Sequence, residues 1–328
     1  MTLTKTAPAV SAVPTARPAA GISLKERFLR VTHLLFALLL LVQLIPDHEG
    51  VSEAHTVWLV GFAVALEILT LALTPLFKKR EGLDLFLDII GFIFGFLLIW
   101  TLATAKLALL PGALFPPFGK VLAQAAEDAP KILVNIKSSV GIILQGFLLA
   151  AAAAIPLGLF LGWNARLGGA ATYLSKFFSS IPPIVYIPYG IALLPSFRSV
   201  SVFVIFLASF WPVFAGTMSG VLNVDKRVLD SAKVLNVSKP TMLFNVILPA
   251  SLAQIFLGCN QGLSVSFILL TSAEMIGARD GMGYYVKYYS DFGDYTRTIV
   301  GLLVIGIVVI AVTFLFNALQ KYLLRWKR

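Results

Sequence analysis

The sequence predicts an all-α integral membrane protein that crosses the bilayer about eight times. Of its 328 residues, 58% are hydrophobic and only 13% are charged, and the mean hydropathy is +0.89. Soluble domains use only about half apolar residues. The apolar residues here are gathered into runs of about 20, the length that an α-helix needs to cross the hydrocarbon core. Only helices or closed barrels satisfy their backbone hydrogen bonds there.

The apolar segments follow a tail, residues 1–24, that is rich in Ala, Pro and Thr and that we expect to be disordered and cytoplasmic. The first segment follows basic residues, as in a signal peptide, but no small-residue cleavage site ends it, so we interpret it as a retained anchor. The fifth contains three prolines, so we expect it to be interrupted. The eight predicted spans are Phe28–Pro46, Val57–Phe77, Leu85–Leu110, Val140–Trp163, Ala170–Pro195, Val200–Leu222, Ala250–Thr271 and Thr298–Leu319.

Basic residues set the predicted orientation. With the N-terminus in the cytoplasm, 18 of the 26 Lys and Arg residues fall in cytoplasmic segments and 8 fall outside. Cytoplasmic loops of membrane proteins carry such an excess of Lys and Arg. We therefore predict a multi-pass protein of the bacterial inner (plasma) membrane with both termini in the cytoplasm.

Several function classes are excluded by composition. The net charge of +10 comes from short clusters between apolar runs, whereas a nucleic-acid-binding protein concentrates Lys and Arg on a solvated face. The single cysteine, Cys259, excludes disulfides, and three histidines provide no metal site. No Gly-rich phosphate loop is present, so a process driven by ATP would need a partner that binds it.

The polar segment 224–249 is basic and, in this orientation, cytoplasmic. Asp225 can cap a helix that runs from Lys226 to Leu235, and Asn236 suits the left-handed conformation that ends a helix. A second short helix can begin at Ser238.

We expect Leu248-Pro249 to turn the chain back into the membrane after this second helix. Two short helices at an angle form a protruding knob on the cytoplasmic face. A soluble subunit that supplies energy could bind to such a knob.

The same segment carries a family resemblance. Asp230-Ser231-Ala232, then Asn236, then Leu248-Pro249 resembles the pattern Glu-Ala-Ala, three residues, Gly, twelve residues, Pro of permease subunits of binding-protein-dependent ABC importers. Asp stands for Glu, Ser for Ala and Asn for Gly. Further motifs resemble the branch of this family that handles nitrate, bicarbonate, sulfonates and taurine: Phe115-Pro116-Pro117, Ile181-Pro182-Pro183, Phe210-Trp211-Pro212, Ala273-Glu274-Met275-Ile276 and Gly281-Met282-Gly283-Tyr284. The family usually has Gly-Leu-Arg where this chain has Gly258-Cys259-Asn260.

The resemblance implies a type I importer permease core of six helices over residues 83–328, preceded by two extra spans over 25–82. In the family, the loop 224–249 inserts a coupling helix into the ATPase subunit. The implied function is the passage of a small solute from an external binding protein into the cytoplasm. The resemblance to this branch implies that the solute is a small anion such as nitrate, bicarbonate, sulfonate or taurine. The chain itself would be no enzyme and would hold no cofactor, because ATP and Mg²⁺ bind to the partner.

The implied partners are two ATPase subunits, a second permease copy (identical or related), an extracytoplasmic binding protein and membrane lipid. A closed two-fold arrangement of the permease copies, with the pathway at their interface, is expected from symmetry. The residues that the resemblance assigns to ATPase coupling are Asp230, Ser231, Ala232, Asn236, Leu248 and Pro249.

Polar residues inside the spans are the candidates for the substrate pathway, because polar groups in hydrocarbon need partners or a water-filled path. The alternatives are helix packing for the polar residues of the seventh span and, for Glu274, a structural hydrogen bond that shapes the turn before Gly281. The candidates are Gln145, Tyr186, Asn260, Gln261, Ser264 and Glu274.

Two other function classes remain open. An ion-gradient-driven secondary transporter should have paired broken helices and several intramembrane carboxylates, and the sequence has one proline-broken span and one deep carboxylate, Glu67. A membrane-embedded enzyme should have clustered catalytic side chains, and no such cluster is visible in the sequence.

Overall fold

The computed structural model describes residues 30–49, 51, 55–77 and 79–327, and all regular elements in these ranges are helices. The predicted tail, residues 1–24, lies outside the described residues. Within the described ranges, six helices are long and apolar enough to cross a membrane: Thr56–Leu76, Arg80–Lys106, Ala129–Trp163, Phe197–Leu222, Lys239–Gly277 and Tyr295–Leu323. The all-α membrane fold is therefore confirmed.

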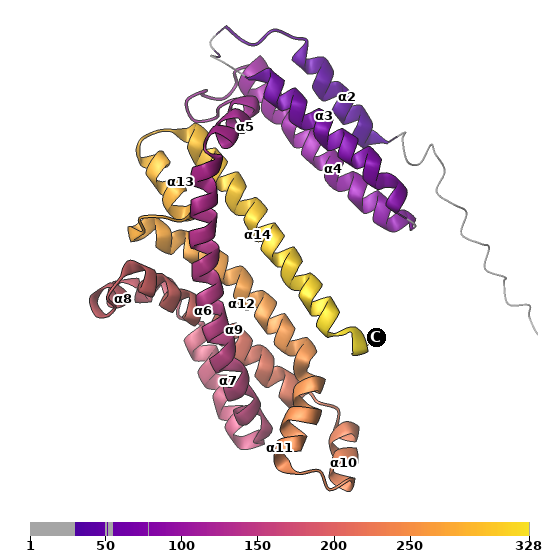
Figure 1. Cartoon of the computed structure of the whole chain (residues 1–328), viewed down its shortest axis with the longest axis vertical. Helices are drawn as coiled ribbons and strands as arrows, with labels where there is room; N and C mark the ends of the chain where they lie inside the picture. The colour runs from indigo at the N-terminus through magenta and orange to yellow at the C-terminus, as the bar shows by residue number, and fades with distance from the viewer. Residues whose placement is uncertain (1–29, 50, 52–54, 78, 328) are drawn as a thin grey trace, which may run out of the picture. The chain divides into compact units, whose positions relative to one another are not determined.

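The chain forms two compact units (Figure 1). Of the described residues, those up to 110 and residues 117–119 form unit 1, and residues 111–116 and 120–327 form unit 2. Because the helix α4 (Arg80–Thr101) packs with the two preceding helices, unit 1 ends later in the chain than the predicted boundary at residue 82. The extent of the permease domain over residues 83–328 stays a prediction.

Unit 1 contains α2 (Val31–Gln43), α3 (Thr56–Leu73) and α4 (Arg80–Thr101), the last continued by a π-helical turn, Leu102–Lys106. Two buried ionisable side chains of this unit, Glu67 and Lys106, have partners inside it. Glu67 of α3 lies 2.5 Å from the His33 ring nitrogen Nδ1, and Lys106 lies 2.7 Å from Asp47 Oδ1. The deep carboxylate Glu67 thus has a partner on the neighbouring helix, as buried ionisable groups require.

Unit 2 contains the remaining helices. They are α5 (Phe118–Glu127), which unit 1 shares at its first two residues, α6 (Ala129–Trp163), α7 (Ala165–Ser179), α8 (Ile187–Leu193), α9 (Phe197–Leu222), α10 (Lys226–Val234), α11 (Lys239–Thr241), α12 (Leu248–Gly277), α13 (Met282–Asp291) and α14 (Tyr295–Leu323). The helix α6 begins eleven residues before the predicted span at Val140. Its first turns carry Lys131 and Lys137, so hydropathy alone underestimated a helix that continues beyond its apolar part.

Small residues hold α6, α9 and α12 together. Three glycines of α6 pack on α9 at positions that rise together along both helices: Gly146 on Ile205, Gly158 on Thr217 and Gly162 on Val221. Three α12 residues also pack on α9, but here the residue numbers rise along α12 while they fall along α9: Ser251 on Gly220, Gly258 on Gly216 and Gly262 on Ser209. Hence α6 and α9 are parallel and α12 is antiparallel to both, with backbones brought close by glycine, as is common in membrane bundles.

This arrangement explains the fifth predicted span. Because α6 and α9 are parallel, the chain between Trp163 and Phe197 has to return along their length. It does so in two pieces, α7 and α8, joined by a turn and the 3₁₀ segment Pro183–Tyr186. The interruption expected within Ala170–Pro195 is therefore confirmed, because proline removes a backbone donor and disfavours a helical conformation in the preceding residue.

Candidate functional site

The helix α10 forms a short projecting element at one end of unit 2 (Figure 1). Asp225 caps it, its carboxylate accepting a hydrogen bond from the Arg227 N–H at 2.9 Å. Asn236 has φ +52, in the left-handed region, and the Val237 N–H donates to the Ala232 carbonyl. Both predicted ends of the helix are confirmed, since Asn tolerates the left-handed conformation that closes a helix C-terminus.

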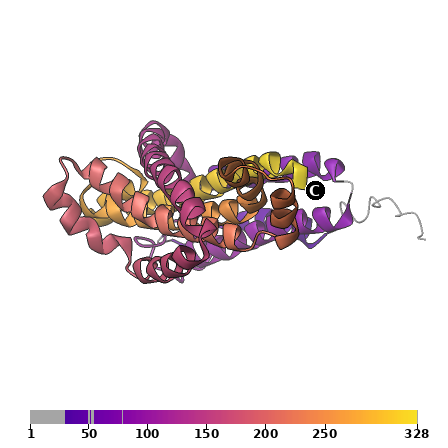
Figure 2. The same cartoon turned by 90° about the horizontal axis from the view of Figure 1, so that it is seen from below.

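One face of α10 is anchored. Ala232 is only 6% exposed and belongs to an apolar cluster with Leu159, Val221, Met242 and Ile247, which come from α6, α9 and the segment before α12. The cluster fixes α10 to the ends of the helices that form the bundle. Figure 2 shows unit 2 from this end, where these elements meet.

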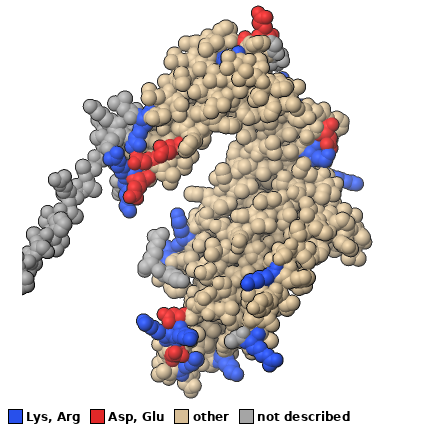
Figure 3. Space-filling model, turned by 180° about the vertical axis from the view of Figure 1, so that it is seen from behind, with Lys and Arg blue, Asp and Glu red and all other residues tan. Residues whose placement is uncertain are grey.

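The opposite face of α10 is exposed and charged at its edges. Asp230 and Lys233 form an ion pair of 3.1 Å in water, and Ser231 donates to the Arg227 carbonyl. Lys and Arg gather at this end of unit 2 in Figure 3.

Two apolar side chains interrupt this charged surface. Val234 is 86% exposed and Leu235 is 77% exposed, at the tip of the knob. The sequence analysis did not predict that Val234 and Leu235 are exposed, because neither residue is a matched position of the family motif. Helix periodicity alone does not show which apolar residues stay uncovered. Exposed apolar side chains inside a charged surface are typical of a contact with another protein.

The predicted turn at Leu248-Pro249 is wrong. The helix α11 continues through a π-helical segment, Met242–Ile247, directly into α12, so that Pro249 lies in the first turn of a long helix. Proline lacks the N–H that would bond to the preceding turn, and a π-helical segment shifts that hydrogen-bond pattern. Pro249 is thus a helix residue, and its coupling role stays a prediction.

The polar residues of α12 divide between its covered and its uncovered sides. Gln261 and Ser264 are exposed on unit 2, and Ser264 donates to the Asn260 carbonyl at 2.9 Å. Asn260 is half-buried and its Nδ2 lies 3.5 Å from Asn317 Oδ1 of α14, while its own buried Oδ1 has no hydrogen-bond partner among the described residues. The structure therefore brings Asn260 into the bundle and leaves its neighbours facing outward.

The other pathway candidates lie on separate elements. Gln145 is exposed on α6, and Tyr186 is half-buried in the 3₁₀ segment before α8. Among the described hydrogen bonds, none joins either of them to Asn260, Gln261 or Ser264, and their role stays a prediction.

Glu274 is 1% exposed and both of its carboxylate oxygens accept hydrogen bonds. Ser139 Oγ donates to Oε1 at 2.6 Å, and the Gly283 N–H donates to Oε2 at 2.7 Å. Gly281 has φ +123, and a side chain there would collide with the Glu274 carboxyl group. This placement favours the structural alternative, in which Glu274 shapes the turn between α12 and α13.

A second buried carboxylate organises the same end of unit 2, and the sequence analysis did not find it. Asp128 precedes α6 and is 3% exposed. Arg297 Nε donates to its Oδ2 at 2.7 Å, and the Tyr285 hydroxyl donates to the same oxygen at 2.8 Å. Burial acts to raise the pKa of Asp128, but these two donors outweigh it and hold the pKa below its usual value. The cluster ties α6, α13 and α14 together.

The comparisons with known proteins agree with this architecture. The family described as the inner membrane component of binding-protein-dependent transport systems matches residues 154–328. A probable ABC transporter permease protein of Brucella abortus is 33% identical over 235 residues, which cover 70% of this chain and 90% of that protein. The bicarbonate transport system permease protein of Synechococcus elongatus is 28% identical over 264 residues, which cover 76% and 92%.

A nitrate import permease protein of Leptolyngbya laminosa is 27% identical over 189 residues, covering 58% of this chain and 66% of that protein. These relatives are transport subunits and not enzymes. The structure shows a helical bundle with glycine-packed spans and a capped helix at one end. The sequence matches to transport permeases cover most of the same chain. The chain belongs to the family of binding-protein-dependent transport system inner membrane components, the permease subunits of ABC importers.

Proposed function

We propose that this permease imports a small anion and that α10 is the element through which ATPase subunits drive it. Two similar proteins are named for nitrate import and bicarbonate transport, which supports the substrate class. The coupling role is supported by the exposure of two apolar side chains at the C-terminal end of α10. Val234 and Leu235 are uncovered there, while Ala232 anchors the same helix to the bundle.

This arrangement suits a mechanical link. A contact on the exposed face of α10 pushes on the cluster of Ala232, and that cluster includes Leu159 of α6 and Val221 of α9. A movement of the ATPase surface is therefore transmitted to the ends of two spans. The coupling residues carried over from the family, Asp230 among them, border this contact.

The outward-facing polar groups of α12 are consistent with assembly of this permease with a second permease copy. Gln261 and Ser264 are exposed on a helix that is apolar enough to cross the membrane, and polar groups in hydrocarbon need partners. We place the pathway between two copies, lined by this face and bordered by Asn260. Two ATPases then bind two knobs, an external binding protein delivers the solute, and both termini lie in the cytoplasm, as the excess of cytoplasmic Lys and Arg favours.

Substitutions at the tip test the docking role. Leu235→Asp should weaken association with the ATPase about tenfold or more, since burying one leucine contributes roughly 1.5–3 kcal/mol and a buried carboxylate is costly. The measurement is the amount of ATPase that co-purifies with the full chain from detergent-solubilised membranes. Phe292→Asp is the matched control, because Phe292 is 73% exposed and follows α13. Equal co-purification of the Leu235→Asp protein and the wild type would refute the docking role.

Transport itself is tested in vesicles that contain the permease, its ATPase and its binding protein. Uptake of labelled bicarbonate, nitrate or taurine should require ATP and should persist when ionophores dissipate ion gradients. Uptake that continues without ATP and stops with ionophores would instead support the secondary transporter. Uptake of none of these solutes would refute the anion proposal.

A further inference from the structure

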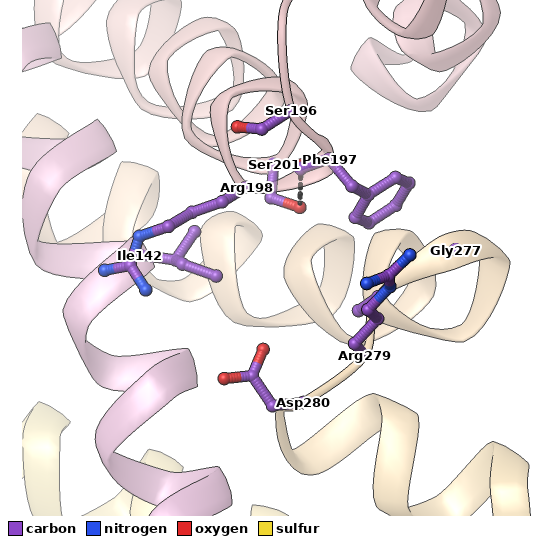
Figure 4. A pocket seen from close by; sticks show the side chains of 9 residues that line it. Ile142, Ser196, Phe197, Arg198, Ser201, Gly277, Arg279 and Asp280 are labelled. Atoms are coloured by element: carbon purple, nitrogen blue, oxygen red, sulfur yellow. Dashed lines mark hydrogen bonds between the residues drawn. The ribbon is translucent and has the colours of Figure 1, made fainter.

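A cavity of about 460 Å³ lies where the N-terminus of α9 meets the C-terminus of α12 (Figure 4). Arg198 comes from the first turn of α9, and Arg279 and Asp280 come from the segment that follows α12. A water molecule takes up about 30 Å³ in the liquid, so the cavity holds a small ion together with several waters.

The two arginines and Asp280 line this cavity, and the arginines come from different helix ends. Figure 4 shows Arg198 reaching toward Ile142 of α6 and Arg279 on the other side, beside Gly277. Arg297 of the same unit is paired with Asp128, whereas neither Arg198 nor Arg279 forms an ion pair with a residue that the structure describes. Guanidinium groups bind carboxylates and other oxyanions through paired hydrogen bonds.

The remaining polar groups of the cavity differ in the hydrogen bonds and charge that they can provide to a ligand. Ser201 donates to the Phe197 carbonyl, and Ser196 Oγ accepts from the Ser199 N–H, so both hydroxyls are already used as helix-terminal contacts. The N-terminus of the 26-residue helix α9 adds partial positive charge. Asp280 projects its carboxylate toward the space between the arginines in Figure 4. An ionised carboxylate only accepts hydrogen bonds.

The cavity lies at the end of α9 away from the coupling knob. The helix has 26 residues and a length of about 39 Å, and α10 follows its other end. If α10 meets the cytoplasmic ATPase, as proposed above, the cavity opens on the side where a binding protein releases its solute.

We propose that this cavity is a binding subsite for a small oxyanion that carries its own hydrogen-bond donor. This inference rests on the proposed function and narrows its substrate class. The arginines bind the oxyanion oxygens, and Asp280 accepts the donor, which is the O–H of bicarbonate or the ammonium group of taurine. Nitrate has acceptor oxygens only, so it would leave the Asp280 carboxylate facing an anion. The cavity therefore discriminates against nitrate.

The experiment measures equilibrium binding of labelled bicarbonate, taurine and nitrate to the full chain with its ATPase in lipid nanodiscs, without the binding protein. Wild type should bind bicarbonate or taurine about tenfold more tightly than nitrate. Arg198→Gln and Arg279→Gln should each weaken that binding about tenfold, since a hydrogen bond to a charged group contributes on this scale. Asp280→Asn should abolish the discrimination, because an amide donates to nitrate.

Arg166→Gln is the matched control, because Arg166 is exposed in the first turn of α7, at the other end of unit 2. Unchanged binding in both cavity arginine variants would overturn the subsite. Nitrate binding to wild type as tightly as the other two anions would overturn the role of Asp280. ATP-driven anion uptake that is intact in the arginine variants would remove this inference and leave the proposed function standing, whereas absence of uptake in wild type would remove the proposed function itself.

Discussion

A close crossing of α9 and α12 provides a sharp test of the fold. A Cβ atom added at Gly258 of α12 would lie 2.6 Å from the Pro212 carbonyl oxygen, 3.1 Å from Gly216 Cα and 3.3 Å from Val213 Cα, all on α9. These are backbone atoms, which cannot rotate away as a flexible side chain can. Gly258→Ala therefore forces the two helices apart.

The magnitude follows from two opposing effects. Overpacking of a tight contact costs about 1–3 kcal/mol, and replacing glycine by alanine inside a helix gains roughly 0.5–1 kcal/mol. Gly306→Ala of α14 isolates the second effect, because no heavy atom lies within 4 Å of an added Cβ there. Gly258→Ala should be less stable than Gly306→Ala by about 1–3 kcal/mol.

The assay is thermal unfolding of the purified full chain in one detergent, followed by the loss of helical circular dichroism. Gly306→Ala should unfold at or slightly above the wild-type temperature, and Gly258→Ala below it. Gly258→Val should unfold lower still, since it adds two further methyl groups at the same contact. Equal unfolding temperatures for the two alanine variants would show that the glycine contact between α9 and α12 does not limit the packing of the bundle.

Two buried carboxylates give the remaining predictions. Because its folded-state pKa lies below the ordinary value of 3.8, Asp128 contributes stability that is complete above pH 3.8 and is lost as the pH falls through the lowered pKa. Asp128→Asn should therefore cost roughly 1.5–3 kcal/mol at neutral pH by weakening the hydrogen bond from Arg297. It should also lack this acid-dependent loss, measured by unfolding between about pH 2 and 6; an unaltered acid dependence would contradict the assignment. Glu274→Gln should cost about 1–3 kcal/mol, because an amide cannot accept from both Ser139 and Gly283. Glu81→Gln, at an exposed position on α4, should change the unfolding temperature little, and an equal effect of the two substitutions would argue against the Glu274 network.

The coupling loop shows how far sequence reasoning reaches. Asp225 and Asn236 act through their own side chain and backbone within a few residues, so their capping and left-handed roles were predictable from residue type. The continuation through Leu248-Pro249 was not, because a proline is compatible both with a turn and with the first turn of a helix. The π-helical segment Met242–Ile247 shows that the helix continues into Pro249 without a turn.

The chain by itself determined the class of the protein. Apolar runs of spanning length, the clusters of basic residues between them and the spacing from Asp230 to Pro249 are local properties, and each acts through hydrophobicity, charge or chain length alone. They identified a helical membrane permease before any contact was known. They also placed the break in the fifth span, since proline acts on its own backbone.

Only the tertiary structure decided which distant residues meet. Asp128 and Arg297 are separated by 169 positions, and Ser139 and Glu274 by 135. No local pattern pairs them, because one pairing depends on how the start of α6 packs against α14 and the other on how α6 packs against α12. The cavity between Arg198 and Arg279 likewise exists because α12 runs antiparallel to α9, which brings the end of one helix to the beginning of the other. Helix direction and glycine contacts set that geometry, and they are properties of packing that hydropathy does not contain.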